Sequence, residues 1–129
     1  MNPLTWPGGA RCAVFFSVNF DAEAFDLKST SEDRLFGRFS YGRYGVRAGL
    51  PRLLAMLARR GIAATVFVTA SDAQRHPDAL HALRDAGHEI AARGMDLSLL
   101  PSLGAGERAA LQACREVLTR ITGLSLIHI

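Results

Sequence analysis

The segment from Arg60 to Gly94, RGIAATVFVTASDAQRHPDALHALRDAGHEIAARG, contains the pattern that decides the fold. Its apolar run from Ile62 to Ala70 predicts a strand that is buried on both faces. A helix is predicted from His76 to Gly87, because proline suits its first turn and glycine its end. A short strand is predicted from His88 to Arg93. A strand, a helix and a second strand in this order indicate a parallel sheet.

The same alternation continues on both sides of this segment. An earlier buried strand is predicted over Cys12–Phe20, a helix over Val46–Gly61 and a last helix over Gly104–Gly123. Residues Asp21–Gly45 show no steady period, which predicts a long loop. The whole order predicts an α/β fold of about three parallel βα units with right-handed crossovers.

Size and charge narrow the possible function classes. The 129 residues suit one domain, and 49% hydrophobic with 21% charged residues is typical of a soluble globular chain. The net charge is +3, and the arginines are scattered without interleaved aromatic residues, so no nucleic acid partner is expected. Apolar runs are too short to span a bilayer, and prolines and glycines interrupt the N-terminus. We therefore expect no membrane partner and a cytoplasmic location.

The two cysteines, Cys12 and Cys114, have no metal-type spacing. Cys12 begins the first apolar run, and Cys114 lies on the apolar side of the last helix. Both are expected to be small buried hydrophobic residues.

The last six residues, LSLIHI from Leu124 to Ile129, form a hydrophobic tail directly after Gly123. Their back-translation fits the mosaic-end adapter of transposase-made sequencing libraries. The hypothesis is that residues 124–129 are adapter read-through and that residues 1–123 are a truncated domain. A genuine short tail is the alternative, and the codons of the source DNA distinguish the two. His128 is accordingly not offered as a ligand.

Parallel α/β folds place their chemistry at the carboxyl ends of their strands. Those ends are predicted at Asn19–Glu23, Thr69–Asp72 and Arg93–Asp96. A carboxylate at Asp21 or Glu23 can bind a metal or act as a general base. The alternative is that Asp21 caps the start of the loop.

The histidines and tyrosines give weaker signals. His88 begins a strand, where a structural role is expected, His76 is expected to start a helix, and His81 lies on an exposed helix face. No two histidines form a convincing zinc site. Tyr41 and Tyr44, set among glycines, suit either a substrate-facing loop or a turn before the helix.

Four segments together resemble the polysaccharide deacetylase family, carbohydrate esterase family four. They are AVFFSVNFDAE, YGVRAGLPRLLAMLARRGIAATVFV, HPDALHALRDAGHEIAARG and LTRITG. The resemblance is to the intracellular branch, with peptidoglycan-deacetylase-like and metal-independent allantoinase-like proteins. It covers nearly the whole chain up to Gly123. It implies the N-terminal part of a distorted (β/α)7-type barrel.

The resemblance also assigns roles to individual positions. The family's aspartate base falls on Asn19, and its aspartate metal ligand falls on Asp21. The two histidine ligands fall on Arg93 and Leu97. An amide does not accept a proton as a carboxylate does, a guanidinium repels a divalent ion, and leucine has no donor atom. Asp21 is then the only ligand-type residue left, so no zinc or other metal cofactor is expected.

The resulting prediction is a hydrolase fragment whose full-length protein acts on carbon–nitrogen (non-peptide) bonds of an N-acetylated sugar or small amide. Arg93 would take over the electrostatic role of the metal, facing Asp21 across the pocket mouth. The fragment itself is expected to be inactive, and a homo-oligomer of the full-length parent is compatible with the sequence. Catalytic positions are expected at Asp21, Asn19 and Arg93, and substrate contacts at Glu23, Tyr41, Tyr44 and Asp96.

Two alternatives remain within this resemblance: a non-catalytic carbohydrate-binding pseudoenzyme, and a metal-independent allantoinase-like amidohydrolase. A response-regulator-like domain is disfavoured, because the only lysine, Lys28, lies in an early loop rather than on a late strand.

Overall fold

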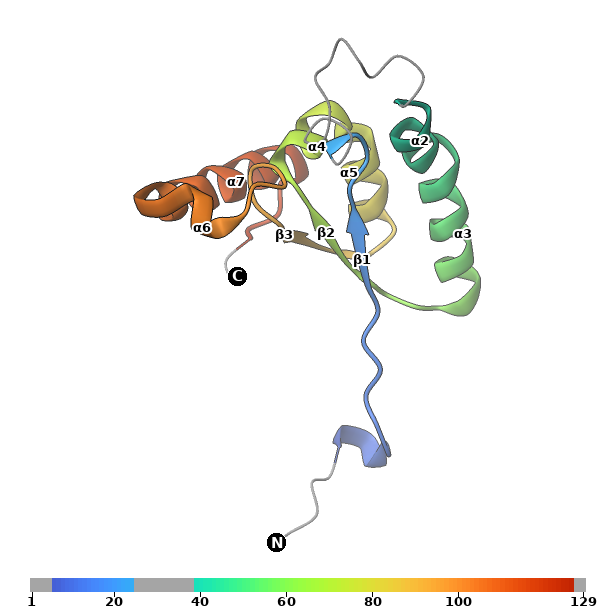
Figure 1. The fold of residues 1–129 in the computed structure, drawn as a ribbon. Coiled ribbons are helices and arrows are strands. Elements are labelled where there is room, and N and C mark those ends of the chain that lie inside the picture. Colours follow the sequence, from blue (N-terminus) through green and yellow to red (C-terminus); the bar gives the residue numbers. More distant parts are fainter. Residues whose placement is uncertain (1–5, 25–38, 127–129) are drawn as a thin grey trace, which may run out of the picture.

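The computed structural model describes residues 6–24 and 39–126 (Figure 1). Within them lies a parallel sheet with the strand order β1-β2-β3. The strands are β1 (Ser17–Phe20), β2 (Thr65–Val68) and β3 (Glu89–Ala92). The predicted α/β fold of about three parallel βα units is confirmed.

Helices connect and flank the strands. The helices predicted over Val46–Gly61, His76–Gly87 and Gly104–Gly123 are present as α3 (Leu50–Arg60), α5 (Pro77–Asp85) and α7 (Glu107–Thr122). None of the helices in the described ranges is long and apolar enough to cross a membrane. The helical elements are η1 (Pro7–Gly9), α2 (Phe39–Tyr44), the π-helix η3 (Gly45–Gly49), α3 (Leu50–Arg60), α4 (Ala70–Arg75), α5 (Pro77–Asp85), α6 (Leu100–Leu103), η4 (Gly104–Gly106) and α7 (Glu107–Thr122).

The strand register determines which side chains point toward the core. Val18, Val66 and Ile90 are aligned across the sheet and pack into the hydrophobic cluster. That cluster also contains Leu50 of α3, Leu80 and Leu83 of α5 and Leu118 of α7. Because side chains alternate along a strand, the next row faces the opposite side of the sheet. That row is Asn19, Phe67 and Ala91.

The first strand is shorter than predicted. Pairing with β2 begins where the Thr65 amide donates to the Phe16 carbonyl (2.9 Å), so residues 12–15 lie outside the sheet. Figure 1 shows this segment running away from the sheet, and Val14 and Phe15 are 74% and 72% exposed. The expectation that Cys12 is buried is wrong: it is exposed, because no described element covers this segment.

The second strand also ends early, at Val68. The Thr69 hydroxyl accepts a hydrogen bond from the Asp72 amide (3.2 Å), which is the N-cap interaction of α4. Both Thr69 and Ala70 were predicted to belong to the strand. Thr69 instead caps α4, and Ala70 begins it. The signal was present in the sequence, since Thr followed three residues later by Asp resembles a capping box.

The predicted loop Asp21–Gly45 contains α2 at its end, which the sequence analysis missed. Residues 25–38 of that loop lie outside the described residues. Gly42 of α2 is buried against the turn after β1: a Cβ there would lie 2.5 Å from the Ala22 carbonyl oxygen. Only glycine permits this approach, so Gly42 fixes how closely α2 packs on the end of β1.

Candidate functional site

An ion pair joins the carboxyl ends of β1 and β3. Arg93 Nη1 donates to Asp21 Oδ1, and each side chain is 32% exposed. Asp21 directly follows Phe20 and Arg93 directly follows Ala92, and both of these residues are aligned with Val68 of β2. The two charged residues therefore lie at the same level of the sheet.

The ion pair extends across the end of β2, which lies between β1 and β3. β1 and β3 each neighbour β2 and not one another. Neighbouring strands lie about 4.8 Å apart, so the backbones of β1 and β3 are separated by about 10 Å. Alternation places Asp21 and Arg93 on the same face as Asn19, opposite to the face that packs into the core. The long guanidinium side chain bridges this gap and has direct access to solvent.

Backbone hydrogen bonds fix the β3 side of the pair. The Arg93 amide donates to the Val68 carbonyl (3.0 Å), and the amides of Ala70 and Ser71 donate to the Gly94 and Met95 carbonyls (2.9 Å each). The start of α4 is thereby joined to the residues that follow β3. Arg93 lies within this connection, so its backbone is well fixed.

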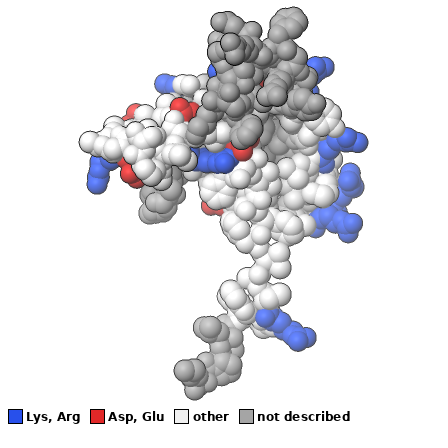
Figure 2. Space-filling model, in the orientation of Figure 1, with Lys and Arg blue, Asp and Glu red and all other residues white. Residues whose placement is uncertain are grey.

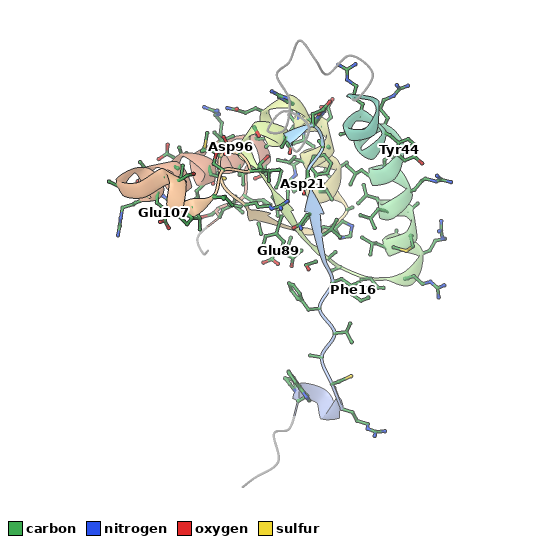
Figure 3. The ribbon with its side chains drawn as sticks, viewed as in Figure 1. Phe16, Asp21, Tyr44, Glu89, Asp96 and Glu107 are labelled. Atoms are coloured by element: carbon green, nitrogen blue, oxygen red, sulfur yellow. The ribbon has the colours of Figure 1, made fainter. Side chains whose placement is uncertain are left out.

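The other residues selected from the sequence are spread around the pair. Asn19 is exposed on the same face as Asp21. The Tyr44 hydroxyl accepts from Arg52 Nη1 (3.1 Å), and Tyr44 lies on α2 apart from Asp21 in Figure 3. Asp96 Oδ1 accepts from the Ser98 amide (2.7 Å) within its own turn. The side chain of Tyr41 lies outside the described part of the chain.

Glu23 belongs to a buried cluster that the sequence analysis did not recognise. Its side chain is 7% exposed, one carboxylate oxygen contacts His76 Nε2, and the other lies 3.7 Å from Arg43 Nε. Asp72, which is fully buried, accepts from the Ala24 amide (3.2 Å) and the Thr69 hydroxyl (3.0 Å). Burial, and to a smaller degree the charge of Glu23, raise the pKa of Asp72 from 3.8, although hydrogen bonds oppose this.

The three described histidines all make specific contacts. His88 is 6% exposed and its Nδ1 accepts from the Ala64 amide (3.3 Å), which confirms its predicted structural role. His76 occupies the N-cap position of α5, as predicted, but its side chain reaches Glu23. His81, predicted to be exposed, is half-buried because its Nε2 lies 2.9 Å from the Ile121 carbonyl.

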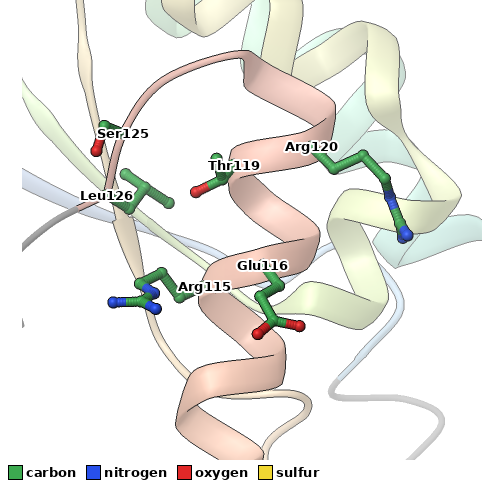
Figure 4. A pocket seen from close by; sticks show the side chains of 6 residues that line it. All are labelled: Arg115, Glu116, Thr119, Arg120, Ser125 and Leu126. Atoms are coloured by element: carbon green, nitrogen blue, oxygen red, sulfur yellow. The ribbon is translucent and has the colours of Figure 1, made fainter.

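The described residues form two further surface hollows, and one of them includes a residue of the ion pair. A groove of about 200 Å³ runs between β1 and the helices η3 and α3, and Asn19 and Asp21 are among the residues that line it. A wider hollow of about 460 Å³ lies between α7 and residues 125–126, and its charged lining is mixed in sign (Figure 4). Basic side chains gather over α3 in Figure 2, where Arg52, Arg59 and Arg60 are exposed. In residues 6–24 and 39–126, no three His, Cys, Asp or Glu side chains are grouped so that they could hold a metal ion.

The fold and the position of the ion pair define a parallel α/β protein with polar residues at the carboxyl ends of its strands. The sequence model of one family, polysaccharide deacetylase, matches residues 28–128. The chain belongs to the polysaccharide deacetylase family. Comparison with curated protein sequences gives no match.

Solved structures agree with this assignment. A protein classed as a polysaccharide deacetylase from Mycobacterium smegmatis has 35% sequence identity and a TM-score of 0.81 over 95% of this chain. One from Pseudomonas aeruginosa PAO1 has 32% identity and a TM-score of 0.82 over 96% of this chain. PuuE allantoinase has 30% identity and a TM-score of 0.79, also over 96%. The chain spans 44% to 48% of the length of these three proteins.

Proposed function

We propose that this chain is part of a hydrolase that acts on carbon–nitrogen bonds other than peptide bonds. The observation that carries the proposal is the contact between Arg93 and Asp21 at the carboxyl ends of β1 and β3. The side chains of this cation and this carboxylate are each 32% exposed, so a substrate on the open face of the sheet can reach them. Membership of the polysaccharide deacetylase family supports an N-acetylated sugar or a related small amide as substrate.

In this proposal Arg93 carries the positive charge that the reaction needs. Its guanidinium would donate to the amide carbonyl of the substrate and stabilise the oxyanion that forms when water attacks. Asp21 would orient the attacking water, accept its proton and return that proton to the nitrogen as the carbon–nitrogen bond breaks. It would also hold Arg93 in place before the substrate binds. Asn19, on the same face, can donate a hydrogen bond but cannot accept the proton.

The donor set does not fit zinc. The Asp21 carboxylate is neutralised by a guanidinium, and the positions that the resemblance assigns to histidine ligands hold Arg93 and Leu97. A cation next to the ligand opposes the binding of a divalent ion, and one carboxylate alone provides too few donors. No step of the proposed reaction therefore passes through a metal ion. A cytoplasmic location, where small amides are accessible, belongs to the same proposal.

Two alternatives have specific support. Similarity to PuuE allantoinase at 30% identity favours an allantoinase-like amidohydrolase. In this alternative the chain would act without a metal and would use the Arg93–Asp21 pair on a different amide. A non-catalytic carbohydrate-binding protein is favoured by the missing carboxylate at Asn19. Such a protein would bind N-acetylated sugars without releasing acetate.

The experiment is an assay of the full-length protein that contains this sequence. Its substrates are an N-acetylated sugar oligomer, with acetate measured, and allantoin, with the ring-opened product measured. Asp21→Asn and Arg93→Gln are each expected to reduce turnover at least about a hundredfold, while Glu116→Gln on the exposed side of α7 leaves it unchanged. Full activity in both site variants would contradict the proposal, and sugar binding without turnover would favour the binding protein. The isolated chain is expected to be inactive.

A further inference from the structure

The turn after β1 is attached to the α4 region by two adjacent residues. The Glu23 side chain contacts His76 Nε2, and the Ala24 amide donates to Asp72 Oδ1 (3.2 Å). Asp72 is further held by the Thr69 hydroxyl, which donates to Oδ2 (3.0 Å). The Glu23–His76 and Ala24–Asp72 contacts connect residues 23–24 with residues 69–76, which are about 50 positions away in the sequence.

The carboxyl groups in this attachment are buried and therefore depend on particular hydrogen-bond donors. The Glu23 side chain is 7% exposed and Asp72 is fully buried, whereas the His76 side chain is 21% exposed. Two carboxyl groups placed side by side in a protein interior need compensating donors. Those donors are His76 and Arg43 for Glu23, and Thr69 and the Ala24 amide for Asp72. A buried carboxylate with such partners is poorly placed to contact substrate.

The same helix also holds the opposite side of the candidate site. Ala70 and Ser71 at the start of α4 donate to the Gly94 and Met95 carbonyls, next to Arg93. On the other side, His76 directly follows α4 and contacts Glu23, which lies two residues after Asp21. Residues 69–76 thus contact both the segment that carries Asp21 and the segment that carries Arg93.

We propose that Glu23 and His76 are positioning residues that hold Asp21 within reach of Arg93. The pair acts through the backbone of residues 21–24, and not by touching substrate. This role replaces the substrate contact predicted for Glu23. It gains its importance from the proposed function, because the residue that it positions is the carboxylate of that site.

The test compares three variants of the present chain by nuclear magnetic resonance. His76→Ala removes the donor to Glu23, His76→Gln keeps an N–H donor, and His81→Ala removes a histidine that instead contacts the Ile121 carbonyl. The readouts are hydrogen exchange of the Ala24 amide, the Asp21 carboxyl carbon shift and the Arg93 guanidinium proton shifts. An Asp21→Asn variant supplies the reference shifts of an Arg93 without its ion pair.

His76→Ala is expected to accelerate exchange of the Ala24 amide about tenfold, the effect of losing one charge-assisted hydrogen bond. The Arg93 shifts should then move toward those of Asp21→Asn. His76→Gln should restore the wild-type values, and His81→Ala should leave them unchanged even if it lowers the stability of the chain. Unchanged Asp21 and Arg93 signals in His76→Ala, or equal changes in His81→Ala, would overturn the proposal.

A measurement on the unmodified chain covers the case in which His76→Ala does not fold. The Ala24 amide should then exchange as slowly as the amides within β2, and exchange at the rate of an unprotected amide would overturn the proposal. None of these readouts requires turnover. A failed hydrolase assay would therefore refute the proposed function and leave the positioning role intact. Unchanged resonance and exchange data would refute the positioning role and leave the proposed function intact.

Discussion

The guanidinium of Arg93, after β3, contacts the carboxylate of Asp21, after β1, across the end of the strand that separates them. Each side chain is 32% exposed, so solvent screens the pair. A double-mutant cycle with Asp21→Asn and Arg93→Gln should give a coupling energy of about 0.5–1 kcal/mol in urea unfolding. The coupling should decrease in about 1 M salt. A coupling of zero at low salt would show that the two residues do not interact in solution.

Gly42 should tolerate no side chain. The Cβ of Gly42→Ala would lie 2.5 Å from a backbone oxygen that has no freedom to rotate away. We expect a loss of about 1–3 kcal/mol in unfolding free energy, as for other overpacked sites. Gly49→Ala is the matched control, since a Cβ there would meet its nearest atom at 3.8 Å and the φ of Gly49 is −63°. Equal stabilities of the two variants would mean that α2 does not pack against Ala22.

The ionisation of Asp72 should oppose folding. Its pKa is raised in the folded chain, mainly by burial, so the folded state binds this proton more tightly than the unfolded state. The resulting stability is present below the unfolded pKa, near 3.8, and is lost as the pH rises through the higher folded value. The Asp72→Asn variant has no carboxyl group to ionise at this position, so it does not lose this stability as the pH rises.

The stability of Asp72→Asn relative to the unmodified chain should accordingly increase with pH over this window and then become constant. Urea unfolding at a series of pH values measures it, with Asp78→Asn on the exposed start of α5 as the control. A relative stability that falls as the pH rises would indicate a lowered pKa of Asp72, contrary to the burial argument.

The two thiols should differ strongly in reactivity. Cys12 is exposed, whereas Cys114 is buried and its thiol donates to the Gly94 carbonyl (3.1 Å). Burial raises the pKa of Cys114, which reduces the thiolate that reacts with a maleimide. Mass spectrometry should show rapid labelling of Cys12 and labelling of Cys114 only when the chain unfolds. Simultaneous labelling of both would mean that α7 does not cover this part of the sheet.

The sequence predicted the fold class well because apolar periodicity reports directly on burial. The runs around Val66 and Ile90 became strands, and the leucines of α3, α5 and α7 became helix faces in the core. The errors occurred where tertiary partners decide the outcome. Apolar composition suggested burial for residues 12–16, but burial requires a covering element, and periodicity within one segment does not report whether there is one.

The candidate site was predictable only in part. Asp21 and Arg93 were correctly predicted to lie at one edge of the sheet, because the carboxyl ends of parallel strands meet there. The cluster of Glu23, Asp72 and His76 was not predicted, since its members are far apart in sequence and no local pattern joins a buried carboxylate to its partner. Thr69 and Asp72 carried a capping signal that would have identified α4.

Zinc titration by calorimetry tests the central claim that an arginine–aspartate pair stands where a metal would bind. The unmodified chain is compared with the double variant Arg93→His/Leu97→His, which places imidazole donors at the two positions that the family resemblance assigns to histidine ligands and removes the competing cation. The account predicts no stoichiometric zinc binding by the unmodified chain, and about one equivalent bound by the double variant. One equivalent of tightly bound zinc in the unmodified chain, abolished by Asp21→Ala, would contradict it.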